Sequence, residues 1–215
     1  MQIEENGHQM GFLRKFMMEN AGAAAAKRIE EKYAPVWFLD TDYKKILVFA
    51  GLGNNGGDGL VIARHLAGYG ANVTVFLLGK PDNIRSEECS WNWSLLEKMK
   101  SVKLLTGGNL EDLNNLKFKI IIDGILGTGI SGEIREPHAS AIEFINGKVW
   151  GGVVSVDVPS GLNPDTGEAN KRCVNANMTV TFHRMKVGMQ KRTDVCGEIF
   201  VEKIGIPLEA EIGVL

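Results

Sequence analysis

The sequence has few cysteines, three in 215 residues, and they lie far apart at Cys89, Cys173 and Cys196. The number is odd, and none of them pairs with the four histidines at a spacing typical of zinc ligands. This pattern argues against a disulfide framework and against a structural zinc site. We therefore expect three free thiols in a reducing compartment, and predict that the protein is cytoplasmic.

Long apolar runs and a strong charge imbalance are also missing. No run approaches the roughly 20 apolar residues that a transmembrane helix needs. Residues 1–10 contain acids and no apolar stretch of the kind that a secretory signal requires. The net charge of −2 at pH 7 predicts no basic surface for nucleic-acid phosphates. We expect no membrane span, no secretory signal and no nucleic-acid partner.

What is present is material for one α/β domain, because 44% of the residues are hydrophobic and 23% are charged. Several strand-like runs are continuously apolar, which is typical of strands buried on both faces of a parallel sheet. Helix-period segments alternate with these runs. The pattern predicts a three-layer α/β/α sandwich around a Rossmann-like, mostly parallel sheet, in a single domain spanning 1–215. The predicted strands are 45–51, 72–79, 102–105, 119–126, 152–160, 177–183 and 198–205.

The α/β core is expected at 45–205, after an N-terminal helical segment within 1–34. We expect the helix of this segment to be interrupted by Gly22 and to end before Pro35, since both residue types disfavour a helix interior. Farther along, Trp91, Leu95 and Met99 recur at helical spacing. That stripe predicts a packing face rather than a cofactor site.

Unusual polar residues follow four of the predicted strands, at the points where these strands end. Asp58 lies just after the first strand of the sheet, Asp123 and Asp157 end later strands, and His183 closes another. Parallel strands bring their carboxyl ends to one edge of the sheet, where ligands bind. Each residue alone is equally consistent with a turn or a helix cap. Together they predict a ligand site, because converging carboxyls need partners.

The stretch "GLGNNGGDG" contains the pattern G-x-G-x-x-G as Gly51, Gly53 and Gly56. A dinucleotide fingerprint also needs an acidic residue at the end of the second strand, and Gly79 and Lys80 stand there instead. The carboxylate of Asp58 would repel a pyrophosphate at the helix N-terminus. These features disfavour a nicotinamide-dependent oxidoreductase.

Five blocks together resemble the YjeF N-terminal domain family, the NAD(P)HX epimerases. They are "MENAG", "GNNGGDGLVIARHL", "IIDGILGTGISGEIREP", "VSVDVPSGLNPDTGE" and "TVTFHRMKVG", spanning about residues 18–188. The resemblance implies a Rossmann-like fold, a homodimer, and epimerisation of hydrated NADH and NADPH. The S and R forms are interconverted so that an NAD(P)HX dehydratase can regenerate the coenzyme. One departure is Asn177, where the family commonly has aspartate, and we expect it at the far end of its strand from the ligands.

The resemblance also implies site residues. The first substrate segment falls on Asn54, Asn55, Gly56, Gly57 and Asp58. The second falls on Gly127, Thr128, Gly129, Ile130, Ser131, Gly132 and Glu133, and Asp157 is a further substrate contact. A potassium ion is implied at Asn55, Asp123 and Ser160, whose amide, carboxylate and hydroxyl oxygens are hard ligands. Such an ion would neutralise part of the acid cluster and let a phosphorylated ligand approach.

We predict that Asp157 is the general acid/base at the hydroxylated carbon, with Asp58 as the second candidate. Epimerisation requires either that the C–O bond breaks and re-forms on the other face or that the ring opens and closes. Both paths move a proton at oxygen. Three alternatives stay open: both carboxyls only orient substrate hydroxyls, the domain is a non-catalytic nucleotide-binding or scaffold module, or it is the disfavoured oxidoreductase. We interpret the basic segment with Arg184, Lys186, Lys191 and Arg192 as a solvated surface rather than a phosphate site.

Overall fold

The computed structural model describes residues 2–107, 109–129 and 132–214. In this part of the chain seven strands form one sheet in the order β3-β2-β1-β4-β5-β6-β7, and every neighbouring pair is parallel. All seven lie where the sequence predicts strands, so the α/β fold with a Rossmann-like parallel sheet is confirmed. The strands are β1 (Lys45–Ala50), β2 (Asn72–Leu78), β3 (Val102–Gly107), β4 (Ile120–Gly124), β5 (Gly152–Val156), β6 (Met178–Phe182) and β7 (Glu198–Glu202).

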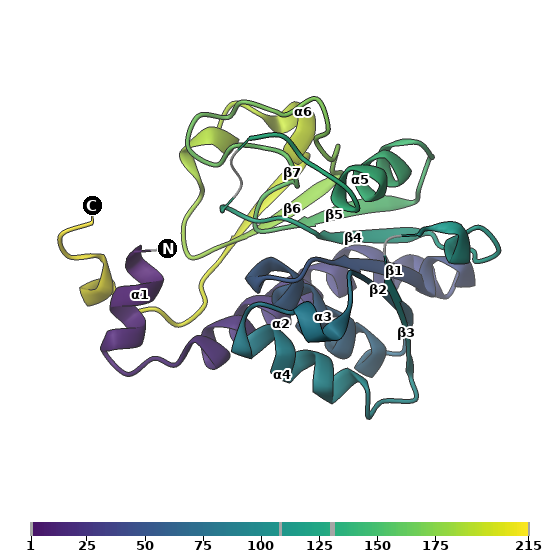
Figure 1. Cartoon of the computed structure of the whole chain (residues 1–215), viewed down its shortest axis with the longest axis horizontal. Helices are drawn as coiled ribbons and strands as arrows, with labels where there is room; N and C mark the ends of the chain where they lie inside the picture. Colours follow the sequence, from purple (N-terminus) through teal and green to yellow (C-terminus); the bar gives the residue numbers. More distant parts are fainter. Residues whose placement is uncertain (1, 108, 130–131, 215) are drawn as a thin grey trace.

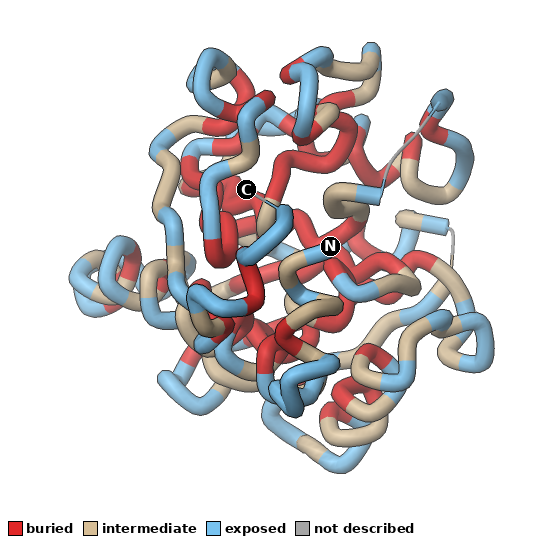
Figure 2. Tube along the Cα trace, turned by 90° about the vertical axis from the view of Figure 1, so that its left-hand side faces the viewer, coloured by how far each residue is buried: buried red, intermediate tan, exposed pale blue. Residues whose placement is uncertain are grey.

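Helices cover both faces of the sheet. In Figure 1, α2 (Arg14–Trp37), α3 (Asn54–Gly68) and α4 (Glu87–Leu96) lie together on one face, and α5 (His138–Asn146) and α6 (Thr193–Cys196) lie on the other. Strand β1 contributes side chains to the hydrophobic core on each face of the sheet. Ile46 and Val48 pack with α2–α4, whereas Leu47 and Phe49 pack with α5, because successive side chains point to opposite faces. Figure 2 shows the buried residues running through the middle of the molecule.

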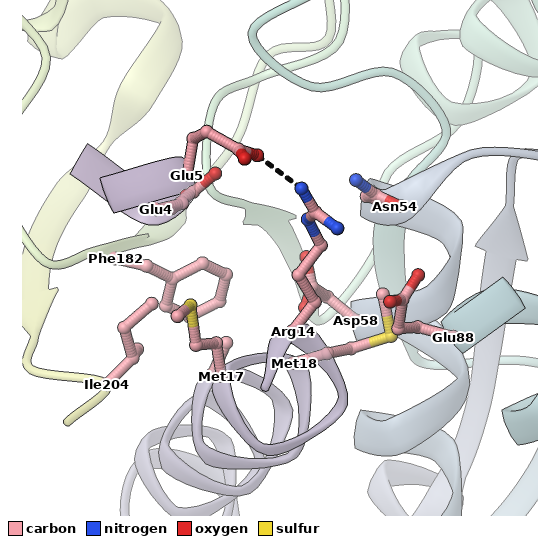
Figure 3. A pocket seen from close by; sticks show the side chains of 11 residues that line it. Glu4, Glu5, Arg14, Met17, Met18, Asn54, Asp58, Glu88, Phe182 and Ile204 are labelled. Atoms are coloured by element: carbon pink, nitrogen blue, oxygen red, sulfur yellow. Dashed lines mark hydrogen bonds and ion pairs between the residues drawn. The ribbon is translucent and has the colours of Figure 1, made fainter. Parts of the chain in front are cut away.

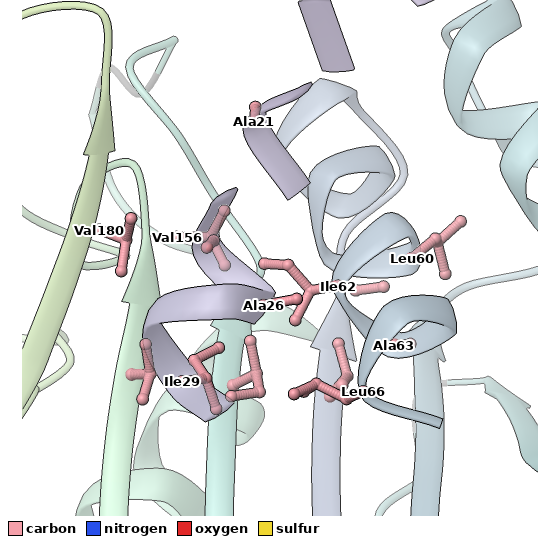
Figure 4. Packing of buried hydrophobic residues seen from close by; sticks show 14 of the residues in the cluster. Ala21, Ala26, Ile29, Leu60, Ile62, Ala63, Leu66, Val156 and Val180 are labelled. Carbon is pink, nitrogen blue, oxygen red and sulfur yellow. The ribbon is translucent and has the colours of Figure 1, made fainter. Parts of the chain in front are cut away.

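The α2–α3 core is tight. Figure 4 shows Ala26 and Ile29 of α2 against Ile62 and Leu66 of α3, above strand residues that include Val156. Small alanines on α2 let the two helices approach each other closely, and the larger side chains fill the space above the sheet. Within the described residues no helix combines the length and the apolar character that crossing a membrane requires.

The order of the strands places a crevice between β1 and β4. Ala50 at the end of β1 is in register with Leu77 of β2 on one side and with Gly124 of β4 on the other. The chain leaves β1 toward one face and β4 toward the other, so the loops after these strands diverge. Such a switch point is where open parallel sheets bind ligands.

Helix α2 corrects two expectations, because it runs without a break through Gly22 and Pro35 to Trp37. Gly22 does not interrupt the helix. A Cβ there would come within 2.4 Å of the Cβ of Val61, so glycine permits the close approach of α2 and α3. Pro35 lies in the last turn, where few hydrogen bonds are lost, and the buried Tyr33 and Trp37 keep this turn packed.

The N-terminal helix α1 (Gln2–Gln9) has no counterpart in our sequence predictions. It is held by the short helix η5 (Leu208–Glu211), whose Ala210 carbonyl accepts a hydrogen bond of 2.9 Å from the Asn6 side chain. In Figure 1 the two chain ends lie side by side. Such a contact between distant segments leaves no periodic trace in a polar eight-residue sequence.

The packing face of α4 also differs from the predicted stripe. Trp91, Leu95 and Met99 are only half-buried. The buried face of the helix is instead formed by Cys89, Asn92, Trp93 and Leu96. The helix is therefore rotated relative to our expectation, because the large Trp93 ring rather than Trp91 fills the core.

Candidate active site

Two neighbouring cavities open at the carboxyl edge of the sheet and meet at Asp58. The larger, about 500 Å³, lies between the segments after β1 and β4 and includes Asp157 in its wall. The smaller, about 260 Å³, lies between α1, α2 and the start of α3. Both are lined by Glu4, Asn54, Asp58 and Phe182.

The first predicted substrate segment is not a loop, because α3 begins at Asn54, with Gly53 as its N-cap. Asn54 and Asp58 are therefore one turn apart on the same helix face, which explains why both line the two cavities. Asn55 lines only the larger cavity. It is buried, and its side-chain amide donates to the Leu126 carbonyl at 2.9 Å.

Gly56 and Gly57 are buried beneath the cavities and do not belong to the residues that line them. A Cβ on Gly56 would lie 1.9 Å from the Gly51 carbonyl oxygen, and one on Gly57 would lie 2.6 Å from the Met18 methyl group. These glycines therefore allow α3 to start directly against the end of β1. That packing is what brings Asp58 to the sheet edge.

The second predicted substrate segment follows β4. Gly127, Thr128, Gly129 and Glu133 line the larger cavity. Ile130 and Ser131 lie outside the described residues. Gly132 is exposed and its carbonyl accepts a hydrogen bond of 3.3 Å from Asn170, but it is not a cavity-lining residue.

Asp157 follows β5 directly and has a left-handed backbone, with φ of +64°. This conformation is uncommon for residues other than glycine, although aspartate tolerates it better than most. Its amide still donates to Val180 on β6 at 2.8 Å, so the bend is anchored to the sheet. Its carboxylate forms an ion pair with Lys186. Our interpretation of Lys186 as part of a solvated surface is therefore wrong.

The other cations of that basic segment have surface roles. Arg184 pairs with Glu211 and Arg192 pairs with Asp194. Lys191 is exposed. Sequence spacing could not single out Lys186, because its partner is 29 positions away.

Asp58 differs electrostatically from Asp157. Burial is the main cause that raises the pKa of Asp58 well above its usual value, and the charges of Asp157 and Glu4 raise it further. Among the described residues no hydrogen bond to the Asp58 carboxyl is formed. The site thus holds one carboxyl that favours the neutral form beside one that is paired with a cation.

Behind the larger cavity lies a cluster of buried oxygens. Asp123, at the end of β4, is fully buried and accepts hydrogen bonds from the Ser155 hydroxyl at 2.8 Å and the Ser160 amide at 2.9 Å. Burial raises the pKa of Asp123, and the hydrogen bonds from Ser160 and Ser155 oppose this shift. The Ser160 hydroxyl donates to the Asp123 carboxylate at 2.5 Å, and the Asn55 amide donates to the Leu126 carbonyl at 2.9 Å. The cluster joins the three predicted potassium ligands.

One oxygen in this cluster has no partner. The side-chain Oδ1 of Asn55 is buried without a hydrogen bond among the described residues. A buried acceptor left unpaired costs free energy unless something else binds it. Amide, carboxylate and hydroxyl oxygens suit a hard monovalent cation. Groups of three or more His, Cys, Asp or Glu residues that could hold a metal do not occur in the described part of the chain.

The smaller cavity is lined by residues that our sequence analysis missed. Figure 3 shows Met17, Phe182 and Ile204 on one side, and Arg14 reaching between Glu5 and Asn54 at the other. Glu5 and Arg14 form an ion pair, which joins α1 to α2. No sequence signal marked Glu4 and Glu5, because α1 itself was not predicted.

Two further asparagines form hydrogen bonds outside the cavities. Asn20 supports the fold rather than the cavity, since its side chain donates to the Ile204 carbonyl at 2.9 Å. Asn177, the departure from the family pattern, accepts a hydrogen bond of 2.8 Å from the amide of Val153, near the start of β5. It lies at the opposite edge of the sheet from the cavities, as expected.

Basic side chains also line the larger cavity. Arg85 is tied to the glycine segment by a hydrogen bond of 2.9 Å from its amide to the Leu52 carbonyl. Arg135 and His138 line the same cavity from the start of α5. Burial and the Arg85 charge lower the pKa of His138, so this imidazole favours its neutral form. The larger cavity is thus lined by both acidic and basic side chains.

Comparison with known proteins places the chain among relatives of one kind. Residues 14–188 match the family model described as "YjeF-related protein N-terminus". The NAD(P)H-hydrate epimerase of Nitrosopumilus maritimus (strain SCM1) is 63% identical over 215 residues, covering 99% of this chain and 95% of the relative. The NAD(P)H-hydrate epimerase of Cenarchaeum symbiosum (strain A) is 60% identical with the same coverage.

A longer relative and a solved structure agree with this match. The bifunctional NAD(P)H-hydrate repair enzyme Nnr of Methanothermobacter thermautotrophicus is 44% identical over 96% of this chain, which spans 39% of that enzyme. The crystal structure of yeast ynu0 (YNL200c) superposes with a TM-score of 0.70 at 31% identity, covering 83% of this chain and 74% of the yeast chain. The family model spans most of the chain and the resemblance seen in the sequence is confirmed: this chain belongs to the YjeF N-terminal family.

Proposed function

We propose that this protein is an NAD(P)H-hydrate epimerase, an isomerase that interconverts the S and R forms of hydrated NADH and NADPH in coenzyme repair. The observation that carries the proposal is the pairing of Asp58 and Asp157 at one cavity at the switch point of the sheet. Two relatives that carry the name of this activity are 60% and 63% identical over nearly the whole chain.

Two carboxyls in different electrostatic surroundings suit this reaction. Breaking and re-forming the C–O bond needs a proton delivered to the leaving hydroxyl and another taken from the water that adds to the opposite face. Opening and closing the ring also moves protons at oxygen. Asp58, whose pKa is raised, is the candidate proton donor, and Asp157, which is paired with Lys186, is the candidate acceptor.

We propose that Asn54, Asn55, Asp58 and Asp157 bind the substrate together with the segment Gly127–Glu133 and the backbone at Gly56 and Gly57. The larger cavity, about 500 Å³, has room for part of a dinucleotide. Arg85 and Arg135, which line the same cavity, supply positive charge for the phosphates.

Potassium is the cofactor that we propose, bound by Asn55, Asp123 and Ser160. The unpaired Asn55 Oδ1 beside the buried Asp123 carboxylate fits such an ion. Bound potassium would supply positive charge behind the substrate and reduce the repulsion between the acidic site and a phosphorylated ligand.

We also propose a homodimer that works with an NAD(P)HX dehydratase in the cytoplasm. Phe12, Leu13 and Phe16, at the junction of α1 and α2, are 42, 48 and 61% exposed, and a second copy would cover them. The Nnr relative is named bifunctional and this chain spans 39% of it, which agrees with a repair step carried out by a second protein or domain. Three buried free cysteines suit a reducing compartment.

The direct test is to incubate the purified chain with separated S- and R-NADHX and to follow their ratio by chromatography. We expect either form to convert to the same mixture faster than in buffer alone, and the same for the forms of NADPHX. Interconversion at the buffer rate, with ligand binding retained, would support the alternative of a non-catalytic nucleotide-binding module.

A further inference from the structure

Lys186 lies between β6 and the short helix η4 (Val187–Met189), and its ammonium group faces inward. Its Nζ donates to the Asp157 carboxylate, to the Thr181 hydroxyl at 3.0 Å and to the Phe182 carbonyl at 3.1 Å. A lysine ammonium has three N–H donors, so all of them are used. The side chains of Lys186 and Asp157 are 20 and 16% exposed, which makes this pair much less solvated than an ordinary surface ion pair.

The two oxygens of Asp157 are in different situations. Oδ1 accepts hydrogen bonds from Lys186, from the Thr181 hydroxyl at 3.1 Å and from the Phe182 amide at 3.2 Å. Oδ2 has no hydrogen-bond partner among the described residues. Since Asp157 lines the larger cavity, Oδ2 is the oxygen left for a ligand there.

Building on the epimerase function proposed above, we propose that Lys186 is a positioning residue that holds Asp157 in place through Oδ1, so that Oδ2 accepts the proton in the reaction. Asp58 then acts as the proton donor. Asp58 has the opposite surroundings, since among the described residues it has neither an ion pair nor a hydrogen bond. The two carboxyls therefore differ in burial and in their partners, and Lys186 is the charged partner of Asp157.

In the path through C–O cleavage, the Asp58 carboxyl gives its proton to the substrate hydroxyl, which leaves as water with the bonding electron pair. The carbon is left in a cation that the two nearby carboxylates stabilise. Water then adds on the opposite face and loses a proton to Oδ2 of Asp157. Transfer of that proton through solvent back to Asp58 restores the starting enzyme.

Other charged groups line the same cavity, and their effects must be distinguished from the effect of Lys186. Those that line it are Glu4 from α1, Asp58 from α3, Arg85, Glu133, Arg135 and His138. Among the described residues, Lys186 is the only cation paired directly with Asp157.

The test compares Lys186→Met and Lys186→Arg with the control Lys191→Met, which removes an exposed charge from the same segment. We expect Lys186→Met to lower kcat by about 10- to 100-fold, the usual effect of removing a group that orients an active-site residue. KM should change little. Lys186→Arg should restore part of the rate, and Lys191→Met should match the wild type.

A double mutant shows whether Lys186 acts through Asp157. We expect Lys186→Met to cause no further loss in an Asp157→Asn background, because the carboxylate that it positions is already gone. Losses that add fully, or a Lys186→Met enzyme with wild-type kcat, would overturn the inference. A wild-type protein without epimerase activity would instead overturn the proposed function, so the two failures are distinguishable. Thermal unfolding of each variant verifies that it is folded.

Discussion

Gly22 of α2 lies directly against Val61 of α3: a Cβ at Gly22 would come within 2.4 Å of the Val61 Cβ and within 3.0 Å of the Asp58 carbonyl oxygen. The two helices therefore cross at the turn of α3 that carries the Asp58 carboxyl. The spacing between the backbones of α2 and α3 sets the position of the Asp58 side chain at the site.

Gly22→Ala should lower the free energy of unfolding by up to about 2 kcal/mol. Forcing extra volume into a packed core usually costs about 1–3 kcal/mol, and the helix preference of alanine over glycine offsets roughly 1 kcal/mol of this cost. The matched control is Gly68→Ala at the end of α3, where an added Cβ meets open space and should stabilise the protein or leave it unchanged. Urea unfolding measures both variants. A Gly22→Ala protein as stable as the wild type would show that the helices can separate without cost.

Asp157→Asn keeps the shape of the side chain and removes the proton acceptor. We expect kcat to fall by on the order of 10²–10⁴, the usual contribution of a positioned proton-transfer group, with little change in KM. Asp58→Asn should also lower kcat, because an amide cannot donate the required proton at useful rates. If Asp58→Asn raises KM and leaves kcat intact, Asp58 only binds substrate. Chromatography of the S and R forms gives both constants.

The free energy of unfolding of the wild-type protein should fall as pH rises, because Asp58 loses its proton. Its pKa is raised in the folded protein, so the stability associated with its protonated form is fully present below the unfolded pKa and is lost as pH rises through the folded pKa. Asp58→Asn stays neutral throughout. We expect this variant to be more stable than the wild type at pH 8, by about 1 kcal/mol, the typical gain when a strained functional residue is replaced. The gain should vanish near pH 3. Asp82→Asn, at an exposed position, should show no such trend.

Potassium should stabilise the protein. At an ion concentration ten times its dissociation constant the expected gain is about 1.4 kcal/mol. For a chain of this size that corresponds to roughly 3–5 °C in Tm. Melting in potassium chloride against choline chloride of equal ionic strength measures it. Ser160→Ala should lose the effect, whereas Ser155→Ala should keep it, because Ser155 also hydrogen-bonds Asp123 but is not a proposed ligand. Equal melting of the wild type in both salts would contradict the site.

Assembly can be tested at the α1–α2 junction. We expect sedimentation at micromolar concentration to give the mass of a dimer, and Phe16→Glu to give a monomer, because a charge on a covered apolar surface opposes association. Leu39→Glu is the control, since Leu39 is 85% exposed and follows the opposite end of α2. A wild-type monomer would rule out the dimer.

The strands and the site residues at their ends were predictable because their causes are local. Runs such as Lys45–Ala50 are apolar throughout, and a parallel sheet brings the segments after these runs to one edge. The sequence therefore pointed to Asp58, Asp123 and Asp157. The roles assigned to them came from the family resemblance rather than from their spacing.

The missed features depend on contacts between distant segments. The basic residue Lys186 looked like a surface residue because its acidic partner, Asp157, belongs to another strand end. Helix α1 is polar and short, and it is held by a turn near the other end of the chain. The continuity of α2 at Gly22 depends on how closely α3 approaches. Helix propensity and periodicity contain none of this information.

The contact between α1 and η5 has a consequence for how the protein is made. Asn6 and Ala210 are 204 positions apart, and Asn20 and Ile204 are 184 positions apart. A ribosome releases the N-terminal helices first, yet they must wait for the last part of the chain before these hydrogen bonds can form. The smaller cavity, which needs Glu4, Met17 and Ile204 together, is completed only then. A nascent chain that stalls before Ile204 can therefore hold a finished sheet and still lack the smaller cavity.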